Sequence, residues 1–283
     1  MRERAAISGR DRTPRSGFTL VEVLVVVAVI ALLLGLLLPA LAKASEQGRQ
    51  MVCLNNARDI SMAAQSYAAD NGGLWPVFPS EVRLTTRQAL FNSWEFGGKT
   101  TSDYWAAPSS RRLVGEAPLN PYVAYDTVLK DPPGSRLELP TFRCPSDPGT
   151  LQRTFWNSNT IPDARVTCYD DVGTSYHMNV QWWYEALRKI GMNAGGQGTL
   201  DVWNQYRTMF NVANFKRPSQ FAWMYDQSMD FIAVGGYSKL GDHGGENKAT
   251  AAFMDGHVKY LTVEPKAADT SEYTLFYERY YRR

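Results

Sequence analysis

The sequence is poor in the residues that build metal centres and catalytic sites. It holds three cysteines and three histidines among 283 residues. No Cys-x-x-Cys pair occurs and no histidine lies beside a cysteine, which excludes the usual spacing of structural zinc sites. Gly-x-Ser-x-Gly, His-Glu-x-x-His and phosphate-loop motifs are also lacking. We therefore expect no enzyme activity, no catalytic residue and no cofactor.

Charge of one sign is scarce as well. The net charge is +2, without a run of like charges. Nucleic-acid-binding proteins concentrate basic residues on one face, so we expect no nucleic-acid partner. Two fragments of a hydrolase site remain, Ser175 near His177 and Asp242 beside His243. The aromatic content of 12% leaves a carbohydrate-binding or adhesive envelope protein open.

The N-terminal part does carry a long hydrophobic run, and a basic segment precedes it. Met1 to Gly17 contains five arginines and only two acidic residues. From Val23 to Ala42, twenty residues follow without a charge. As a helix this run is about 30 Å long, enough to cross the hydrocarbon core of a membrane. The arginines before it predict that the N-terminus is cytoplasmic and that the rest of the chain lies across the inner membrane.

Glu22 interrupts the start of this apolar region. A charged group in a membrane-spanning helix is costly and is usually functional, so we expect Glu22 to have a partner. Two other interpretations remain. Glu22 can lie among the lipid head groups without a partner, and Ala40-Leu41-Ala42 has the small-x-small form that signal peptidase cuts. The apolar run is longer than the core of an ordinary secretory signal, which argues against the second interpretation.

A resemblance to the prepilin leader-peptidase motif of type IV pilins and type II secretion pseudopilins is carried by Gly17-Phe18-Thr19-Leu20-Val21-Glu22. It implies cleavage between Gly17 and Phe18 and methylation of the new amine of Phe18 by prepilin peptidase. It also implies that Glu22 pairs with the terminal amine of a neighbouring subunit during assembly. Pro39 lies where many pilins place a helix-bending proline.

The resemblance implies partners and a location too. The expected partners are other pilin-like subunits, in a homopolymer or heteropolymer, together with prepilin peptidase, the inner-membrane assembly machinery and membrane lipid. The chain would pass the inner membrane once, with a cytoplasmic N-terminus and a periplasmic C-terminal domain, and would then enter an extracytoplasmic filament. The alternative is a membrane-anchored envelope binding or adhesive protein that does not assemble.

The helix is predicted to continue beyond the membrane, because Lys43 to Asp70 contains no proline. Its apolar side chains recur at steps of four and three residues, at Cys53, Ala57, Ile60, Ala64 and Tyr67. This spacing predicts one narrow buried stripe. Gly72 and Gly73 supply a stop. A continuous helix from Phe18 to Asp70 would be about 80 Å long, and Pro39 should bend it.

The remaining chain predicts long loops followed by strands. Strands are expected at Gln220–Tyr225, Phe231–Val234, Ala249–Met254 and His257–Val263. Val180–Ile190 is expected to form a short helix, and Ser271–Tyr280 a closing helix or strand.

Asp255-Gly256 predicts a hairpin with a two-residue loop. Such a loop places Phe253 opposite Val258 and Ala251 opposite Tyr260, and we expect this face to cover the helix stripe.

The expected fold class is therefore α+β and pilin-like. One long N-terminal helix, which spans the membrane in its first half, packs on a C-terminal antiparallel sheet with long loops. Residues 1–17 form the basic leader, residues 18–42 the transmembrane and assembly half of the helix, and residues 43–283 the periplasmic globular domain.

A second resemblance lies near the C-terminus. Asp242-His243 and the later Asp255-Gly256-His257 are similar to the His-to-Asp-Gly signature of a large group of bacterial pilin-like proteins. The intervening segment, Gly244 to Met254, is longer than is usual in that group, so the role of His243 is not carried over. These side chains are also candidates for a bound calcium ion, as in related pseudopilins, because carboxylates bind divalent ions. The turn alone accounts for Asp255-Gly256.

The three cysteines leave at least one thiol unpaired. A periplasmic domain permits one disulfide, and three pairings are compatible with the sequence. We favour Cys53–Cys144, because Cys53 lies on the helix stripe and Cys144 lies in a proline-rich turn that can cap it.

Overall fold

The computed structural model describes most of the chain, namely residues 19–76, 81–83, 88–90, 93–105, 114–129, 137–155, 165–182, 197–199, 210–211 and 215–276. The chain divides into two compact units, Met1–Ser45 and Glu46–Arg283, and each is described by itself. The expected cleavage site, Gly17 and Phe18, lies outside the described residues.

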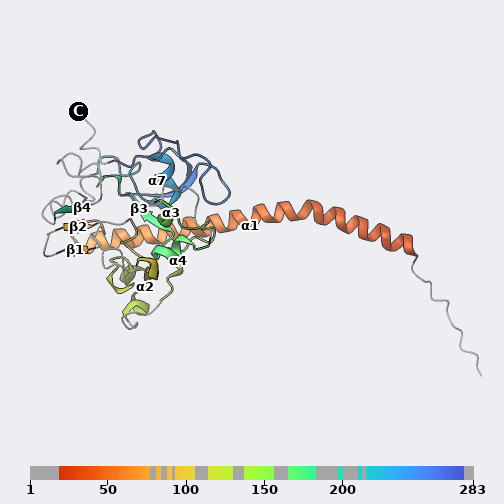
Figure 1. The fold of residues 1–283 in the computed structure, drawn as a ribbon, viewed down its shortest axis with the longest axis horizontal. Coiled ribbons are helices and arrows are strands. Elements are labelled where there is room, and N and C mark those ends of the chain that lie inside the picture. The colour runs from red at the N-terminus through yellow and green to blue at the C-terminus, as the bar shows by residue number, and fades with distance from the viewer. Residues whose placement is uncertain are drawn as a thin grey trace, which may run out of the picture. The chain divides into compact units, whose positions relative to one another are not determined.

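Helix α1 spans Leu20–Asp70 and contributes to both units (Figure 1). The prediction of one long helix is confirmed, and the helix continues through Pro39. The bend expected at Pro39 stays a prediction. Every residue from Leu20 to Ser45 is exposed, so no other described residue of the first unit covers the apolar side chains of this half. The helix is long and apolar enough to cross a membrane.

The second half of α1 buries the stripe that its periodicity predicts. The five predicted residues are each at most 6% exposed: Cys53, Ala57, Ile60, Ala64 and Tyr67. The helix ends at Asp70, and Gly72 and Gly73 follow with φ of 64° and 84°. The Gly73 N–H donates to the Ala68 carbonyl at 2.7 Å, which closes the last turn of the helix.

A four-stranded antiparallel sheet forms the centre of the second unit, in the order β3-β5-β6-β7. Its strands are β3 (Tyr176–Met178), β5 (Ala222–Asp226), β6 (Lys248–Phe253) and β7 (Val258–Thr262). Strands β5, β6 and β7 confirm three of the predicted strands to within two residues at each end. Strand β3 was not predicted, and its three residues are too few to show a period.

The predicted strand at Phe231–Val234 is wrong. These residues belong largely to helix α7 (Ser228–Ala233). Met229, Ile232 and Ala233 are buried together in one cluster at helical spacing. A run of four apolar residues does not distinguish a strand from a helix, and here burial on one side of the sheet favours the helix.

The predicted loop of the β6–β7 hairpin is one residue too short. Ala252 pairs with Val258 and Ala251 with Lys259, and the Phe253 N–H donates to the His257 carbonyl at 2.9 Å. Three residues therefore connect the strands, and the last of them, Gly256, has φ of 91°. A type I turn followed by a left-handed residue forms such three-residue loops.

Two hydrophobic clusters lie on opposite faces of this sheet. The first joins the α1 stripe to Trp223, Met224, Ala252 and Val258. The second joins Ala251, Phe253 and Tyr225 to helix α7. The sheet thus packs between the second half of α1 and α7. The expected α+β, pilin-like architecture is confirmed, although Ala251 and Phe253 face away from α1.

Shorter elements complete the described part of the second unit. A three-stranded antiparallel sheet has the order β1-β2-β4 and comprises Glu81–Arg83, Gln88–Leu90 and Gln197–Thr199. The short α-helices are α2 (Asn120–Leu129), α3 (Gln152–Phe155) and α4 (Cys168–Val172). Single 3-10 turns are η1 (Asp103–Trp105), η2 (Val114–Glu116) and η3 (Pro140–Phe142).

Two predicted segments are only partly described. Of the helix expected at Val180–Ile190, residues beyond Trp182 lie outside the described residues. Of the closing element expected at Ser271–Tyr280, residues 271–276 form bends, with isolated bridges from Thr274 to Phe221 and Asp269, rather than a helix or a strand. The rest lies outside the described part.

A disulfide fastens α1 to the sheet side of the second unit. It joins Cys53 to Cys144 with a Cα–Cα distance of 5.2 Å, and Cys168 is left as a free, buried thiol. The Tyr176 hydroxyl donates to the Cys53 carbonyl at 3.1 Å, and the Asn56 amide donates to the Arg143 carbonyl at 2.9 Å. Both hydrogen bonds flank the disulfide and hold the same turns of α1.

Non-reducing peptide mapping of the full chain should find Cys53 joined to Cys144 and Cys168 as a free thiol. Changing both joined cysteines to serine should lower the free energy of unfolding by about 2–5 kcal/mol, because the unfolded chain loses the constraint of a long loop. Cys168→Ser is the matched control and should keep the mapped disulfide. A Cys144–Cys168 peptide would contradict this connectivity.

The stability of the second unit should also depend on His177, which is 2% exposed on β3. Burial lowers the pKa of His177 from 6.5 to about 3. Between these values the unfolded chain binds a proton that the folded chain does not, so stability falls as pH drops below 6.5. The loss is at most about 1.4 kcal/mol per pH unit.

Denaturant midpoints measured from pH 7 to pH 4 should therefore fall more steeply for the wild type than for His177→Gln. Parallel pH profiles for the two proteins would show that His177 does not carry this dependence.

Candidate functional site

Glu22 caps the N-terminus of its own helix. The backbone N–H and the hydroxyl of Thr19 both donate to Glu22 Oε2 at 2.8 Å. The Glu22 N–H donates in return to Thr19 Oγ1 at 3.3 Å. This reciprocal arrangement is a capping box, which satisfies N–H groups that the first turn of a helix leaves without partners. Thr-x-x-Glu before an apolar run is the sequence signature of this box, and it was not predicted.

The capping box holds the Glu22 carboxylate at the N-terminal end of α1. The N-terminus that cleavage would create lies one residue before this box in the sequence. Phe18, the expected new N-terminal residue, immediately precedes Thr19. Both bonds from Thr19 go to Oε2, so Oε1 is left to accept from a group outside this helix. A carboxylate accepts several hydrogen bonds at once, so capping and a pair with an ammonium group are compatible.

The surface around this acid is apolar. Between Leu20 and Leu41, large apolar side chains are 48% to 81% exposed on all sides of the helix. Soluble monomers rarely expose a patch of this extent, so the surface has to be covered by lipid or by other apolar helices.

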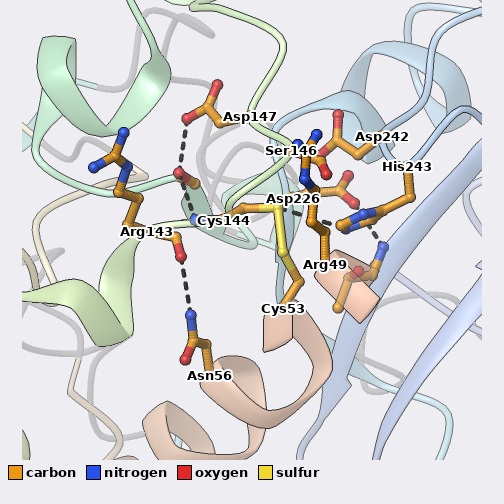
Figure 2. Close-up of a disulfide and its surroundings, with 12 residues drawn as sticks. Arg49, Cys53, Asn56, Arg143, Cys144, Ser146, Asp147, Asp226, Asp242 and His243 are labelled. Atoms are coloured by element: carbon orange, nitrogen blue, oxygen red, sulfur yellow. Dashed lines mark hydrogen bonds between the residues drawn. A yellow bond between two sulfur atoms is a disulfide. The ribbon is translucent and has the colours of Figure 1, made fainter. Parts of the chain in front are cut away.

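At the start of the second unit, the side chain of Glu46 connects α1 to two loops. Ser146 Oγ donates to Glu46 Oε1 at 2.5 Å, and His243 Nδ1 lies 3.0 Å from the same oxygen. The hydrogen bond from Ser146 holds the pKa of Glu46 below its usual value, and burial lowers the pKa of His243. Since a carboxylate only accepts, His243 Nδ1 carries the proton and Nε2 faces Cys144 Sγ at 3.5 Å (Figure 2).

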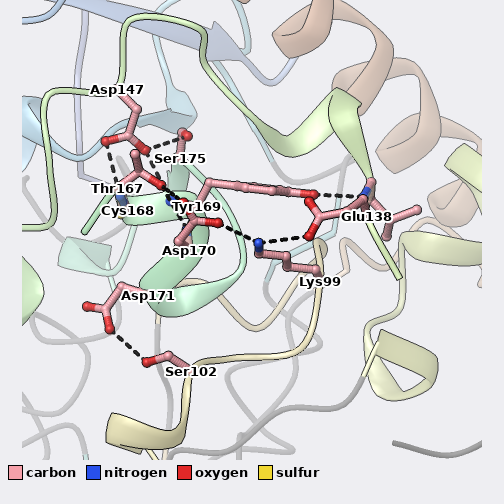
Figure 3. Close-up of polar contacts among 11 residues, drawn as sticks. Lys99, Ser102, Glu138, Asp147, Thr167, Cys168, Tyr169, Asp170, Asp171 and Ser175 are labelled. Atoms are coloured by element: carbon pink, nitrogen blue, oxygen red, sulfur yellow. Dashed lines mark hydrogen bonds and ion pairs between the residues drawn. The ribbon is translucent and has the colours of Figure 1, made fainter. Parts of the chain in front are cut away.

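The loop that carries Cys144 and Ser146 is fixed by Asp147 (Figure 3). The Asp147 carboxylate accepts from the backbone N–H groups of Cys168 and Tyr169, both at 3.1 Å, at the first turn of α4. It also accepts from Ser175 Oγ at 2.7 Å. These bonds hold the loop against α4 and β3 and so fix the position of Cys144.

Two buried carboxyl groups lie beside this network. Asp226 is 2% exposed and accepts from Ser228 Oγ and the Thr250 N–H, both at 2.6 Å. Burial raises the pKa of Asp226 to about 6. Burial, followed by the neighbouring charge of Asp226, raises the pKa of Asp242 well above its usual value. The charge of Asp226 thus disfavours ionisation of the neighbouring Asp242.

The four residues considered for a metal site fall into separate groups. Asp255 Oδ1 lies 2.6 Å from His257 Nδ1 on the hairpin turn, where His257 also stacks on Phe253. His243 instead faces Glu46 and Cys144. Among the described residues, one group of ligand atoms lies close enough to hold an ion, and it consists of Cys53, Cys144 and His243. The bound calcium considered from the sequence stays a prediction.

The fragments of a hydrolase site do not combine. Ser175 Oγ donates to Asp147, and His177 Nδ1 lies 2.9 Å from Ser93 Oγ instead. His243 Nδ1 pairs with Glu46 and not with its neighbour Asp242. The buried Ser93–His177 contact is closed off from solvent, since these residues are 8% and 2% exposed.

Comparison with known proteins assigns the N-terminal region. Residues 12–38 match the family model described as the prokaryotic N-terminal methylation motif. No curated protein and no solved structure matches the chain. The C-terminal signature therefore has no support beyond its resemblance. The matched residues include Gly17, Phe18 and Glu22, so the chain carries a prepilin-type N-terminus, which supports a type IV pilin-like protein.

Proposed function

We propose that this chain is a pseudopilin-type subunit of a type II secretion or type IV pilus filament. Prepilin peptidase removes residues 1–17 and methylates the new amine of Phe18. The first half of α1 then anchors the subunit in the inner membrane, and the second unit lies in the periplasm. The observation that carries the proposal is Glu22, a capped acid at the start of an uncovered apolar helix within a methylation motif.

The uncovered surface of α1 supports two successive environments. In the membrane, lipid covers the side chains from Leu20 to Leu41. In a filament, the same side chains of neighbouring subunits cover one another. Burial of apolar surface stabilises by roughly 25 cal/mol per Å² only where water is replaced. In lipid little is gained by helix association, so packing and polar pairing must determine how the subunits associate.

Glu22 supplies such a polar pair. In a single subunit it is bonded to Thr19 and lies near the membrane surface. In a filament core without water, a carboxylate needs a cation, and the ammonium group of Phe18 on a neighbouring subunit is the one that leader cleavage creates. A buried ion pair fixes the register of two subunits more than it adds net stability. Cleavage is therefore a precondition of assembly.

Processing gives the first test. In protein purified from membranes, mass spectrometry should find a mature chain that begins with N-methyl-Phe18. Gly17→Val should block cleavage, because the larger side chain crowds the peptidase site next to the scissile bond. A mature start near Lys43 would identify an ordinary secretory signal and overturn the proposal.

Assembly gives the second test. Glu22→Val should insert, be cleaved and fold like the wild type, since α1 is apolar around this position. Its incorporation into filaments, or the secretion it supports, should fall by roughly tenfold or more, because the ammonium group of a neighbour is left buried without a partner. Glu22→Gln should show a milder defect, since an amide still accepts a hydrogen bond.

A matched control moves the acid rather than removing it. The double variant Val21→Glu/Glu22→Val keeps the charge and the composition but turns the carboxylate by about 100° around the helix, away from Thr19. It should be as defective as Glu22→Val if position matters. If Glu22→Val or the moved acid assembles like the wild type, α1 is an anchor only, and a membrane-tethered binding or adhesive protein becomes the better interpretation.

A further inference from the structure

Three metal-binding side chains converge where α1 enters the second unit. Cys53, Cys144 and His243 place their ligand atoms within 4.8 Å of one another. His243 Nε2 lies 3.5 Å from Cys144 Sγ. In a tetrahedral site with Zn–S bonds of about 2.3 Å and Zn–N bonds of about 2.1 Å, two such ligands are roughly 3.6 Å apart. The nitrogen and the sulfur therefore already have the separation that one shared zinc ion requires.

The imidazole is oriented as a ligand and not as a surface group. Its Nδ1–H donates to Glu46 Oε1 at 3.0 Å. The lone pair of Nε2 therefore points to Cys144 Sγ, which His243 faces in Figure 2. Histidines that bind metals donate their other ring N–H to a carboxylate or carbonyl in the same way, which fixes the tautomer and the ring plane. Ser146, which also donates to Glu46, holds that carboxylate in place.

The backbone at His243 is held in an uncommon conformation. His243 has φ of 56°, a left-handed value that is unusual for a residue other than glycine. The Tyr260 hydroxyl donates to the carbonyl of the preceding Asp242 at 2.7 Å, and the Tyr260 and His243 rings meet edge to face. Strained backbone that its surroundings maintain is concentrated at functional sites. Here it directs the imidazole at the cysteines.

The site is also shielded from water. Cys53 is 0% exposed, Cys144 is 3% exposed, and the side chain of His243 is 1% exposed. The partly exposed Glu46 side chain lies at its edge. Thiolate and imidazole are the ligands that select zinc over calcium or magnesium. Three protein ligands leave a fourth position of the tetrahedron for water.

We propose that, before the disulfide forms, Cys53, Cys144 and His243 bind one Zn²⁺ ion, and that the zinc-bound and disulfide forms exclude each other. On binding, each thiol releases its proton to solvent as its sulfur bonds to zinc. Once zinc has left, the two sulfurs together give two electrons to an external disulfide oxidant, which leaves as two thiols, and the Cys53–Cys144 bond forms. The site thus delays oxidation of Cys53 and Cys144 until the ion is lost.

The second buried Cys–His pair of the chain provides a control. Cys168 Sγ lies 3.1 Å from His177 Nε2, but Cys168 is the free cysteine and this pair has no second thiol. A dithiol site for zinc is therefore expected at Cys53 and Cys144 and not at Cys168.

The test uses the full chain in detergent, reduced with a phosphine and dialysed against buffered free Zn²⁺. Reduced wild type should bind one Zn²⁺ per chain, and the oxidised protein none. Reduced protein loaded with Co²⁺ should show thiolate-to-cobalt charge-transfer absorption and the visible bands of a tetrahedral ion. His243→Gln should weaken zinc binding by roughly tenfold or more, and Glu46→Gln by roughly 10–100-fold. Cys168→Ser should bind like the wild type.

His243→Gln keeps both cysteines, so its fold is checked in the disulfide form by circular dichroism before reduction. The proposal is overturned if reduced wild type binds no more zinc than Cys53→Ser/Cys144→Ser, whether or not the reduced chain stays folded. It is also overturned if Cys168→Ser loses the ion, or if His243→Gln binds zinc as tightly as the wild type.

Discussion

Helix α1 carries apolar side chains on every side of its first half and along one narrow stripe of its second half. No single solvent suits both patterns. The stripe is satisfied within the second unit, where Ala57 and Ala64 share one buried cluster with Trp223 and Met224 of β5. The first half, exposed from Leu20 to Ser45, is covered by no other described part of the chain. Such a surface needs lipid or other apolar helices to cover it, and the proposed function supplies both.

The acid at the start of α1 suits the proposed membrane and filament stages, because the helix cap uses only one of its two oxygens. Oε2 of Glu22 completes a capping box with Thr19, and the interaction is local, so it exists in any surroundings. Oε1 is left for a partner outside the helix. The cap also limits the rotamers of Glu22, which reduces the conformational entropy lost in the proposed pairing with the ammonium group of a neighbour. The cap thus preorganises Glu22 as an acceptor.

How much the sequence predicted depended on the range of the interactions. The helix, its buried stripe and its Gly-Gly stop were predicted, because each follows from spacing within a few turns. The hairpin was predicted at the right place but with a loop one residue too short, so the register slipped by one. Successive side chains of a strand alternate between faces, so the predicted register placed Ala251 and Phe253 of β6 on the α1 side. In the structure they lie on the α7 side.

Helix α7 was missed, because four apolar residues show no period. The network of Glu46, Ser146 and His243 could not be predicted, since its members are 100 and 197 residues from Glu46 and no local pattern marks them.

That long-range network has a mechanical consequence if the second unit is pulled through α1. Tension that passes along α1 into the second unit first reaches the turns around Glu46 and Cys53. Those turns carry the disulfide to Cys144, the bonds from Ser146 and His243 to Glu46, and the bond from Asn56 to the Arg143 carbonyl. Apolar contacts along the stripe can be separated one turn at a time, and each turn resists little by itself. The disulfide prevents this turn-by-turn separation. The helix stays attached at Cys53 as long as Asp147 holds the Cys144 loop against α4. The covalent attachment therefore lies at the turns of α1 that such tension reaches first.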